Sequence, residues 1–315
     1  MKVLIVTNMY PTSEQPAFGT FVEDQVAALR RAGVTMDVLF INGRKGKLHY
    51  LWGVLQLWQR LLKERYDLIH AHYVFSGVIA RLQFLRPVVV TYHGSELGVH
   101  PNSWLGRLSR TIYPLFNRLI VVSPWMKLSL NNPTNVRVIP CGINFEEMKP
   151  ISKAEARQIL GLPHDKPLVV WAGEPWRSEK RYSMIEQAVD LVRKDIPEAE
   201  LILVSGRSHA VIPVYLSSCD VLALTSSYEG SPMLIKEAMA CNLPIVSVDV
   251  GDVAEVIGGT EGCYLVDPTP QAVADKLRLL LSHPHRTNGR THVAHLRSEV
   301  IAGQIIEVYR ELIGS

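Results

Sequence analysis

The stretch from residue 228 to residue 240 reads Tyr228-Glu229-Gly230-Ser231-Pro232-Met233-Leu234-Ile235-Lys236-Glu237-Ala238-Met239-Ala240. It follows an apolar run, residues 220–225, that is typical of a buried strand. Ser231 is a favoured N-cap residue and Pro232 suits a first helical position, so we expect a helix from Pro232 to Ala240. A helix that starts where a parallel strand ends points its free N–H groups at the crevice, where an anion can bind. The stretch therefore predicts an α/β fold with an anion site between Glu229 and Glu237.

The same alternation of short apolar runs and helical stretches extends along the whole chain. Such runs predict buried parallel strands at residues 3–7, 36–41, 67–71, 88–92, 119–122, 136–139, 167–172, 200–204, 221–225, 244–248 and 263–266. The pattern restarts near residue 150, and a final helix is expected from Val293 to Leu312. We therefore expect two α/β domains, residues 1–150 and 151–292, with a ligand cleft between them.

Length and composition narrow the function classes. The 315 residues are more than one ordinary core accommodates, and 47% of them are hydrophobic. A net charge of +3 with no long basic run argues against a nucleic-acid binder. Apolar runs stay below the roughly 20 residues that span a bilayer, and the N-terminal residues read as a strand, so a cytoplasmic protein is expected. The four cysteines lack the spacing of a zinc site.

The loop after the first strand, residues 7–20, lacks the GxGxxG pattern, which disfavours a dinucleotide-binding first half. It ends in Gly19-Thr20 before a helix, where the backbone could approach a phosphate. The same residues fit a helix-entry glycine that contacts no ligand. Both interpretations of Gly19 remain open.

Four motifs in order resemble the GT-B glycosyltransferases of family 4 (group 1), similar to those of cell-envelope polysaccharide and teichuronic-acid type. They are Glu229 with Glu237 as E-x7-E, Val138-Ile139-Pro140-Cys141-Gly142-Ile143-Asn144, Thr91-Tyr92-His93-Gly94-Ser95-Glu96 and Val121-Val122-Ser123. The resemblance implies two Rossmann-like domains and a C-terminal helix, about residues 293–315, that returns to the first domain. It implies a retaining transferase that moves a hexose-type sugar from a nucleotide-diphosphate sugar.

The resemblance also assigns roles by position. Glu237 would bind the ribose hydroxyls, Glu229 would face the donor sugar, and His93 would lie near the reacting carbon. The backbone of Gly230, Ser231, Pro232, Met233 and Leu234 would supply N–H groups to the sugar and phosphates. No metal and no cofactor is implied beyond the donor, which would be UDP- or GDP-linked. A solvated helix-end charge is the alternative interpretation of each glutamate.

Two departures from the family pattern affect this site. Glu174 stands where the family has an arginine for the diphosphate, so we expect Lys180 to keep its role and Arg177 to replace the missing cation. A solvated loop cation is the alternative for both. The segment after Ser205 is short, and Arg207 and His209 are candidates to line the reduced base pocket. His70 and His72 end a strand, and we expect their side chains to point in opposite directions.

The first domain is expected to bind the acceptor, which would be a glycan, a lipid-linked or a small molecule. Residues 45–63 and 104–113 mix basic with Trp and Leu residues, which suits peripheral contact with the cytoplasmic face of a membrane. The same stretches also fit core-packing helices with a solvated basic face. Two rival functions remain open, namely an epimerase or phosphorylase on the same two-domain shell and a non-catalytic sugar-nucleotide-binding relative.

Overall fold

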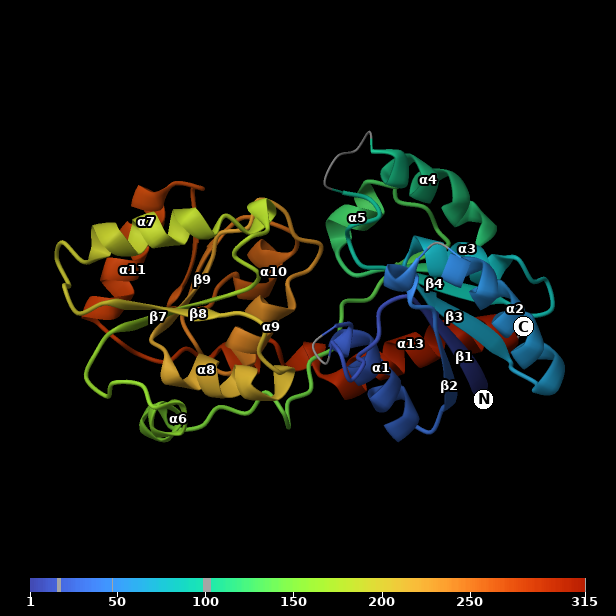
Figure 1. The fold of residues 1–315 in the computed structure, drawn as a ribbon, viewed down its shortest axis with the longest axis horizontal. Coiled ribbons are helices and arrows are strands. Elements are labelled where there is room, and N and C mark those ends of the chain that lie inside the picture. Colours follow the sequence, from blue (N-terminus) through green and yellow to red (C-terminus); the bar gives the residue numbers. More distant parts are fainter. Residues whose placement is uncertain (16–17, 47, 99–102, 315) are drawn as a thin grey trace. The chain divides into compact units, whose positions relative to one another are not determined.

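The computed structural model describes residues 1–15, 18–46, 48–98 and 103–314, and the chain divides into two units (Figure 1). The first unit comprises Met1–Gly142 with Ser298–Ser315, and the second comprises Ile143–Arg297. The boundaries predicted from the sequence lay after residues 150 and 292. The last helix belongs to the first unit, as expected from the family resemblance.

The first unit is built on a parallel sheet, six-stranded in the described residues, of order β2-β1-β3-β4-β5-β6. Its strands are β1 (Lys2–Thr7), β2 (Thr35–Phe40), β3 (Leu68–His72), β4 (Val88–Tyr92), β5 (Arg118–Val121) and β6 (Val136–Val138). Its α-helices are α1 (Thr20–Arg31), α2 (Leu48–Lys63), α3 (Val74–Arg81), α4 (Trp104–Ile112), α5 (Pro124–Leu128) and α13 (Ser298–Ile313). Helix α1 packs beside α13 and α2 beside α3 (Figure 1).

The second unit is built on a parallel sheet of order β11-β10-β9-β7-β8, five-stranded within the described residues. Its strands are β7 (Leu168–Ala172), β8 (Glu200–Val204), β9 (Val221–Leu224), β10 (Ile245–Val248) and β11 (Cys263–Val266). Its α-helices are α6 (Lys153–Leu160), α7 (Tyr182–Val192), α8 (Ile212–Ser218), α9 (Met233–Ala240), α10 (Val253–Ile257), α11 (Pro270–Ser282) and α12 (Gly289–His292). Short 3-10 turns cover Ser178–Lys180 and His209–Val211.

The predicted strands are confirmed, since each predicted run overlaps a strand of the structure. Strand β1 reads KVLIVT and is buried beyond its first residue, and β4 (VVVTY) is buried throughout. Side chains buried on both faces of a sheet must be apolar at every position rather than at every second one. The fold is therefore the expected pair of Rossmann-like α/β units.

The expected final helix from Val293 is wrong at its start. The chain forms α12 (Gly289–His292) and a 3-10 turn (Ala294–Leu296), and α13 begins only at Ser298. Arg297 is extended, with φ −55° and ψ 139°, and pairs with Ile143 in an isolated bridge. An extended residue interrupts the helical hydrogen bonds, so the two segments cannot join.

Candidate functional site

Both sheets change winding direction at one point, and the candidate residues follow the strands there. In the first unit the change lies between β1 and β3, and in the second it lies between β7 and β9. Ligands of open parallel sheets bind in the crevice outside the carboxyl ends of such strands. The loops after these four strands therefore define two candidate half-sites, one in each unit.

In the second unit the structure brings Lys180 and Glu229 together. The Lys180 ammonium lies after β7 and donates to Glu229 Oε1 at 2.7 Å, and Glu229 lies after β9. Both side chains are mostly buried. A mostly buried, charge-assisted bond is stronger than a surface ion pair, and it places a cation and a carboxylate at one point of the sheet edge.

The loops that carry this pair are fastened to each other. Arg181 Nε donates to the Thr225 carbonyl at 2.6 Å, and the Thr225 hydroxyl donates to the Lys180 carbonyl at 3.0 Å. The Ser227 amide donates to the Glu179 carbonyl at 2.7 Å. Arg181 adopts the left-handed region, with φ 48°, at the N-cap of α7. The position of Lys180 relative to Glu229 is therefore fixed by backbone contacts rather than by the ion pair alone.

The expected helix start at Pro232, with Ser231 as the N-cap, is wrong by one residue. Pro232 is the N-cap, α9 begins at Met233, and the Ser231 side chain does not cap it. The Ser231 hydroxyl instead donates to Asp252 Oδ2 at 2.7 Å and accepts from the Lys236 ammonium at 2.6 Å. Because the Ser231 hydroxyl is bound to the charged Asp252 and Lys236 side chains, it is not available to accept from the backbone N–H groups at the start of α9.

Lys236 and Asp252 form a buried ion pair beneath the Glu229 loop. The Lys236 side chain is fully buried, and its ammonium lies 3.2 Å from Asp252 Oδ2. Gly251 packs against this loop with φ +63°, and an added Cβ would lie 3.1 Å from the Gly230 carbonyl oxygen. Lys236 and Asp252 were not predicted from the sequence. The detectable signal was a second charged residue, Lys236, beside Glu237 in a helical stretch that is otherwise apolar.

Glu237 lies on the inner side of α9 and is held by His209. His209 Nε2 is 2.8 Å from Glu237 Oε1, and Glu237 is buried. His209 belongs to the 3-10 turn that forms the short connection after β8. The shortened segment and the second glutamate of the motif are thus brought together. The remaining Glu237 oxygen can accept further hydrogen bonds.

Arg177 and Arg207 do not join this cluster. Arg177 is exposed and pairs with its own loop, at 2.7 Å from Nε to Glu179 Oε1 and at 3.6 Å from Nη1 to Glu174. Arg207 is exposed after β8. Arg177, which we expect to stand in for the missing arginine, is thus already paired, mainly with Glu179 and more distantly with Glu174.

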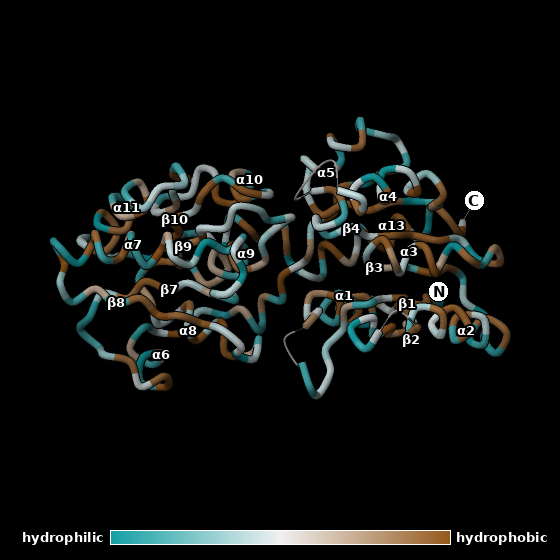
Figure 2. Tube along the Cα trace, turned by 45° about the horizontal axis from the view of Figure 1, so that its top comes forward, coloured by the Kyte–Doolittle hydropathy of each residue, from teal (hydrophilic) through white to brown (hydrophobic). Residues whose placement is uncertain are grey.

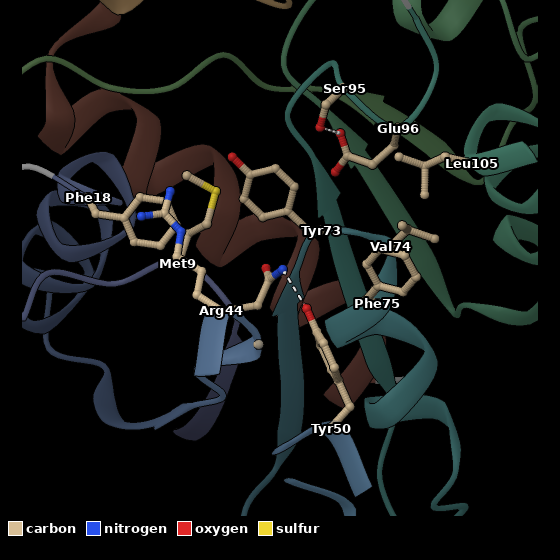
Figure 3. A pocket seen from close by; sticks show the side chains of 12 residues that line it. Met9, Phe18, Arg44, Tyr50, Tyr73, Val74, Phe75, Ser95, Glu96 and Leu105 are labelled. Atoms are coloured by element: carbon tan, nitrogen blue, oxygen red, sulfur yellow. Dashed lines mark hydrogen bonds between the residues drawn. The ribbon is translucent and has the colours of Figure 1, made fainter. Parts of the chain in front are cut away.

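In the first unit a cavity of about 400 Å³ opens beyond the carboxyl ends of β1, β2, β3 and β4 (Figure 3). It is lined by Asn8, Met9, Phe18, Gly43, Arg44, Tyr50, Tyr73, Val74, Phe75, Ser95, Glu96 and Leu105. The Arg44 guanidinium lies 3.8 Å from the centre of the Phe18 ring, and Asn8 donates to the Tyr50 hydroxyl at 3.3 Å. Aromatic faces beside hydroxyl, amide and carboxylate groups suit a polyhydroxylated ligand.

Glu96 is the buried carboxyl group at this cavity. Its two oxygens accept from the His93 amide at 3.1 and 3.2 Å, and Ser95 donates a further bond. Burial raises the pKa of Glu96 to about 7, although these hydrogen bonds lower it. A carboxyl group with a pKa near neutrality can both accept and release a proton at the working pH.

His93 lies behind this cavity in a stack of three histidines. His72 Nδ1 is 3.0 Å from His93 Nε2, and the rings of His70 and His72 stack with centroids 4.6 Å apart. The expectation that His70 and His72 point in opposite directions is wrong. Residues two apart on a strand share a face, and here both are buried.

Burial keeps these histidines neutral. It lowers the pKa of His72 to about 3 and holds the pKa of His93 well below its usual range, with the neighbouring His72 as a smaller cause. His93 also packs 4.8 Å from the ring centre of Phe21 and of Tyr73. A neutral His93 offers one donor and one acceptor nitrogen, and His72 engages Nε2.

Gly19 has a packing explanation. It is the N-cap of α1 in the left-handed region, with φ 78°. A Cβ built at Gly19 would lie 2.6 Å from the Met9 carbonyl carbon, so only glycine fits beside this backbone. The residue type follows from this approach whether or not a phosphate binds there.

Two kinds of feature are absent from the described residues. No helix in the described ranges is long and apolar enough to cross a membrane. The described His, Cys, Asp and Glu side chains form no group of three that could hold a metal ion.

Comparison with family models matches both units. Residues 2–147 match the model described as Glycosyltransferase Family 4, and residues 164–293 match the model described as Glycosyl transferases group 1. The two matches cover the loops that carry both half-sites.

Two similar proteins are also named as glycosyltransferases. The chain is 24% identical to the putative teichuronic acid biosynthesis glycosyltransferase TuaC of Bacillus subtilis, over 88% of each chain. It is 23% identical to an Escherichia coli protein named UDP-Gal:alpha-D-GlcNAc-diphosphoundecaprenol alpha-1,3-galactosyltransferase, over 72% of this chain and 67% of that one.

Solved structures share the fold. The sucrose-phosphate synthase of Thermosynechococcus elongatus superposes with a TM-score of 0.83 at 22% identity, over 99% of each chain. Anabaena HepE in complex with UDP and glucose superposes with a TM-score of 0.75 at 17% identity, over 99% of this chain and 100% of that one. These similarities concern the arrangement of the backbone.

Proposed function

The chain belongs to the GT-B glycosyltransferases of family 4 (group 1), and from this we propose a retaining, metal-independent hexosyl transfer from a nucleotide-diphosphate sugar. The donor would bind to the second unit and the acceptor, a glycan or a lipid-linked or small molecule, to the first. The observation that carries the proposal is the cluster of Lys180, Glu229, His209 and Glu237 at the β7–β9 edge. It offers a cation for a diphosphate and carboxylates for sugar hydroxyls.

Each group in this cluster has a distinct task in the proposal. Lys180 neutralises charge that develops on the diphosphate as the glycosidic bond breaks. Glu237 accepts hydrogen bonds from the ribose hydroxyls while His209 holds its other oxygen in place. Glu229, once Lys180 turns to the diphosphate, accepts from hydroxyls of the transferred sugar. Backbone N–H groups at the start of α9 add further donors, and Ser231 serves through its backbone because its hydroxyl is engaged.

The acceptor half of the proposal rests on the cavity in the first unit. Its aromatic walls can stack on sugar faces, and Glu96 can hold an acceptor hydroxyl and share its proton. His93 lies behind Tyr73 at this wall, and we assign it to the donor sugar as the family motif implies.

Arg177 and Arg207 keep only accessory roles, since they are exposed and apart from the cluster. The enzyme would work in the cytoplasm.

A donor screen tests the proposal. A ligand that binds only the folded chain raises the free energy of unfolding, by about 2.7 kcal/mol at a concentration of 100 Kd. The melting temperature rises as a result. We expect a shift with UDP- or GDP-linked hexoses, followed by release of the nucleoside diphosphate when an acceptor is present. Retention is read from the anomeric configuration of the product, and metal independence from turnover in a chelator. No shift with any nucleotide sugar would contradict the donor site.

A further inference from the structure

Helix α1 places one amide side chain on the face that its apolar residues bury. The buried residues Val22, Val26 and Leu29 recur at helical spacing, and the tube of α1 changes between brown and teal along its length (Figure 2). Gln25 stands three residues after Val22 and four before Leu29, so it shares this face. The amide nitrogen of Gln25 lies 3.4 Å from Nε2 of His72, the last residue of β3.

This contact decides which ring nitrogen of His72 carries the proton. Burial lowers the pKa of His72 to about 3, so the ring is neutral and has one N–H donor and one bare nitrogen. An amide nitrogen can only donate, so Nε2 of His72 is the bare nitrogen and accepts from Gln25. The proton of His72 therefore lies on Nδ1.

The proton of the neighbouring ring, His93, follows from that of His72. His72 Nδ1 lies 3.0 Å from His93 Nε2. Because Nδ1 of His72 is the donor, Nε2 of His93 must accept, and the proton of the neutral His93 ring lies on its Nδ1. Hydrogen bonds are thus donated in one direction, from Gln25 to His72 and from His72 to His93.

The Nδ1 proton of His93 faces a weak acceptor. Cys141 Sγ lies 3.8 Å from this nitrogen, and a thiol sulfur accepts hydrogen bonds only weakly. His93 is half-buried whereas His72 is fully buried, so of the two rings only His93 can meet a ligand. An oxygen atom accepts more strongly than a sulfur atom, so a ligand oxygen can displace Cys141 from this N–H group.

His93 is also held in direction from two further sides. Its backbone N–H donates to both oxygens of Glu96, and its ring packs at 4.8 Å from the ring centres of Phe21 and of Tyr73. Phe21 belongs to α1, the helix that carries Gln25. A ring with a fixed direction and a fixed proton offers one oriented N–H donor.

We propose that Gln25 and His72 are positioning residues that hold the proton of His93 on Nδ1, from where His93 donates to an oxygen of the transferred sugar in place of Cys141. Gln25 and His72 do not touch the sugar, and both act through His93. The inference rests on the proposed function in one respect, because that function assigns His93 to the donor sugar.

Nitrogen-15 NMR of the full chain measures the position of the proton without a donor. Two-bond proton–nitrogen correlations distinguish a protonated from a bare ring nitrogen. A His93→Gln variant identifies the signals of His93 among those of the 11 histidines. We expect the proton of His93 on Nδ1. A parent chain with this proton on Nε2 would overturn the proposal.

Gln25→Glu should reverse the direction of donation. A carboxylate can only accept, so His72 would carry its proton on Nε2, and its bare Nδ1 would accept from Nε2–H of His93. Spectra are recorded at about pH 9, where an imidazolium next to a carboxylate has also lost its charge. We expect the proton of His93 to move to Nε2.

Gln304→Glu is the matched control, because Gln304 is exposed on α13 of the same unit. It should leave the proton of His93 on Nδ1. The same tautomer of His93 in Gln25→Glu and in Gln304→Glu would overturn the proposal.

Cys141→Ala tests the other end of the series. The thiol accepts from His93 and does not set its tautomer, so we expect the proton to stay on Nδ1 in this variant. A proton that moves to Nε2 would show that Cys141, rather than Gln25, sets the tautomer, and would overturn the proposal.

Turnover connects the tautomer to the transferred sugar. Gln25→Glu should lower kcat with the nucleotide sugar about tenfold, the effect of one lost hydrogen bond. The rise in melting temperature with the nucleoside diphosphate alone should equal that of the parent. An unchanged kcat with a reversed tautomer would overturn the contact between His93 and the sugar. A parent chain that turns over no nucleotide sugar would contradict the proposed function instead, and the spectra would still decide whether Gln25 sets the tautomer.

Discussion

The Lys180 ammonium and the Glu229 carboxylate are joined by a 2.7 Å hydrogen bond at the carboxyl edge of the second sheet. Each group is therefore the hydrogen-bond partner of the other, and this bond must break before either group can contact a donor. In the proposed donor complex, a diphosphate would have to compete with Glu229 for Lys180, and the sugar hydroxyls would then bind the released carboxylate. The pair would in this way couple the recognition of the diphosphate to that of the sugar.

Lys180→Met should abolish most turnover. The variant removes the cation that we assign to the leaving diphosphate, and the loss of one such donor costs about 10²- to 10³-fold in kcat. Steady-state release of nucleoside diphosphate measures the effect. Lys166→Met is the control, because Lys166 pairs with Glu200 on an exposed surface. A Lys180→Met variant as active as the control would exclude the assigned role.

Glu229→Gln should separate the two halves of the donor. Without the carboxylate, Lys180 is free for a diphosphate, so we expect the affinity for the nucleoside diphosphate alone to be equal or higher. Turnover of the nucleotide sugar should fall about tenfold or more, since an acceptor of the sugar hydroxyls is weakened. Calorimetric titration and turnover assays measure the two effects. Affinities that fall equally for both ligands would show that Glu229 acts on the loop as a whole.

The strands could be predicted from the sequence because each is a short, mostly apolar run, and the inner ones, such as β4 and β9, are buried throughout. Helix α3 (Val74–Arg81) was missed because it follows Tyr73 directly, in an unusual backbone conformation with φ 70°. The hydrophobic pattern of the sequence does not indicate so abrupt a change from strand to helix. The start of α13 was missed for a similar local reason, the extended residue Arg297.

The candidate site could be predicted by position and not by contact. The sequence indicated Glu229, Glu237 and Lys180, but the bond between Lys180 and Glu229 depends on loops that lie 49 positions apart. Ser231 looked like a helix cap because its competing partner, Asp252, comes from another loop. The burial of Lys236 is likewise a property of the packed unit. Such partners are distant in sequence, so no local sequence pattern indicates which residues will meet.

Lys236→Met should destabilise the second unit strongly. Removing one member of a buried ion pair leaves the other charge uncompensated, which costs about 3–5 kcal/mol in the free energy of unfolding. Denaturant unfolding measures the loss. The double variant Lys236→Met/Asp252→Leu should recover much of it, because no buried charge remains. Lys194→Met, an exposed lysine, should be neutral. A neutral Lys236→Met would mean that water reaches Asp252.

Glu96→Gln should change how the free energy of unfolding depends on pH. Burial raises the pKa of Glu96 from 4.5 to about 7, so between these values the folded chain keeps a proton that the unfolded chain has released. The parent therefore loses stability as the pH rises through this window, by up to about 3 kcal/mol, and the variant does not. The buried histidines act in the opposite sense below pH 6.5, and they cancel when the variant is subtracted from the parent. Ser95→Ala should extend the loss to higher pH, because the Ser95 hydroxyl lowers the pKa of Glu96. Parallel profiles for the parent and Glu96→Gln from pH 4.5 to 8 would show that Glu96 is solvated.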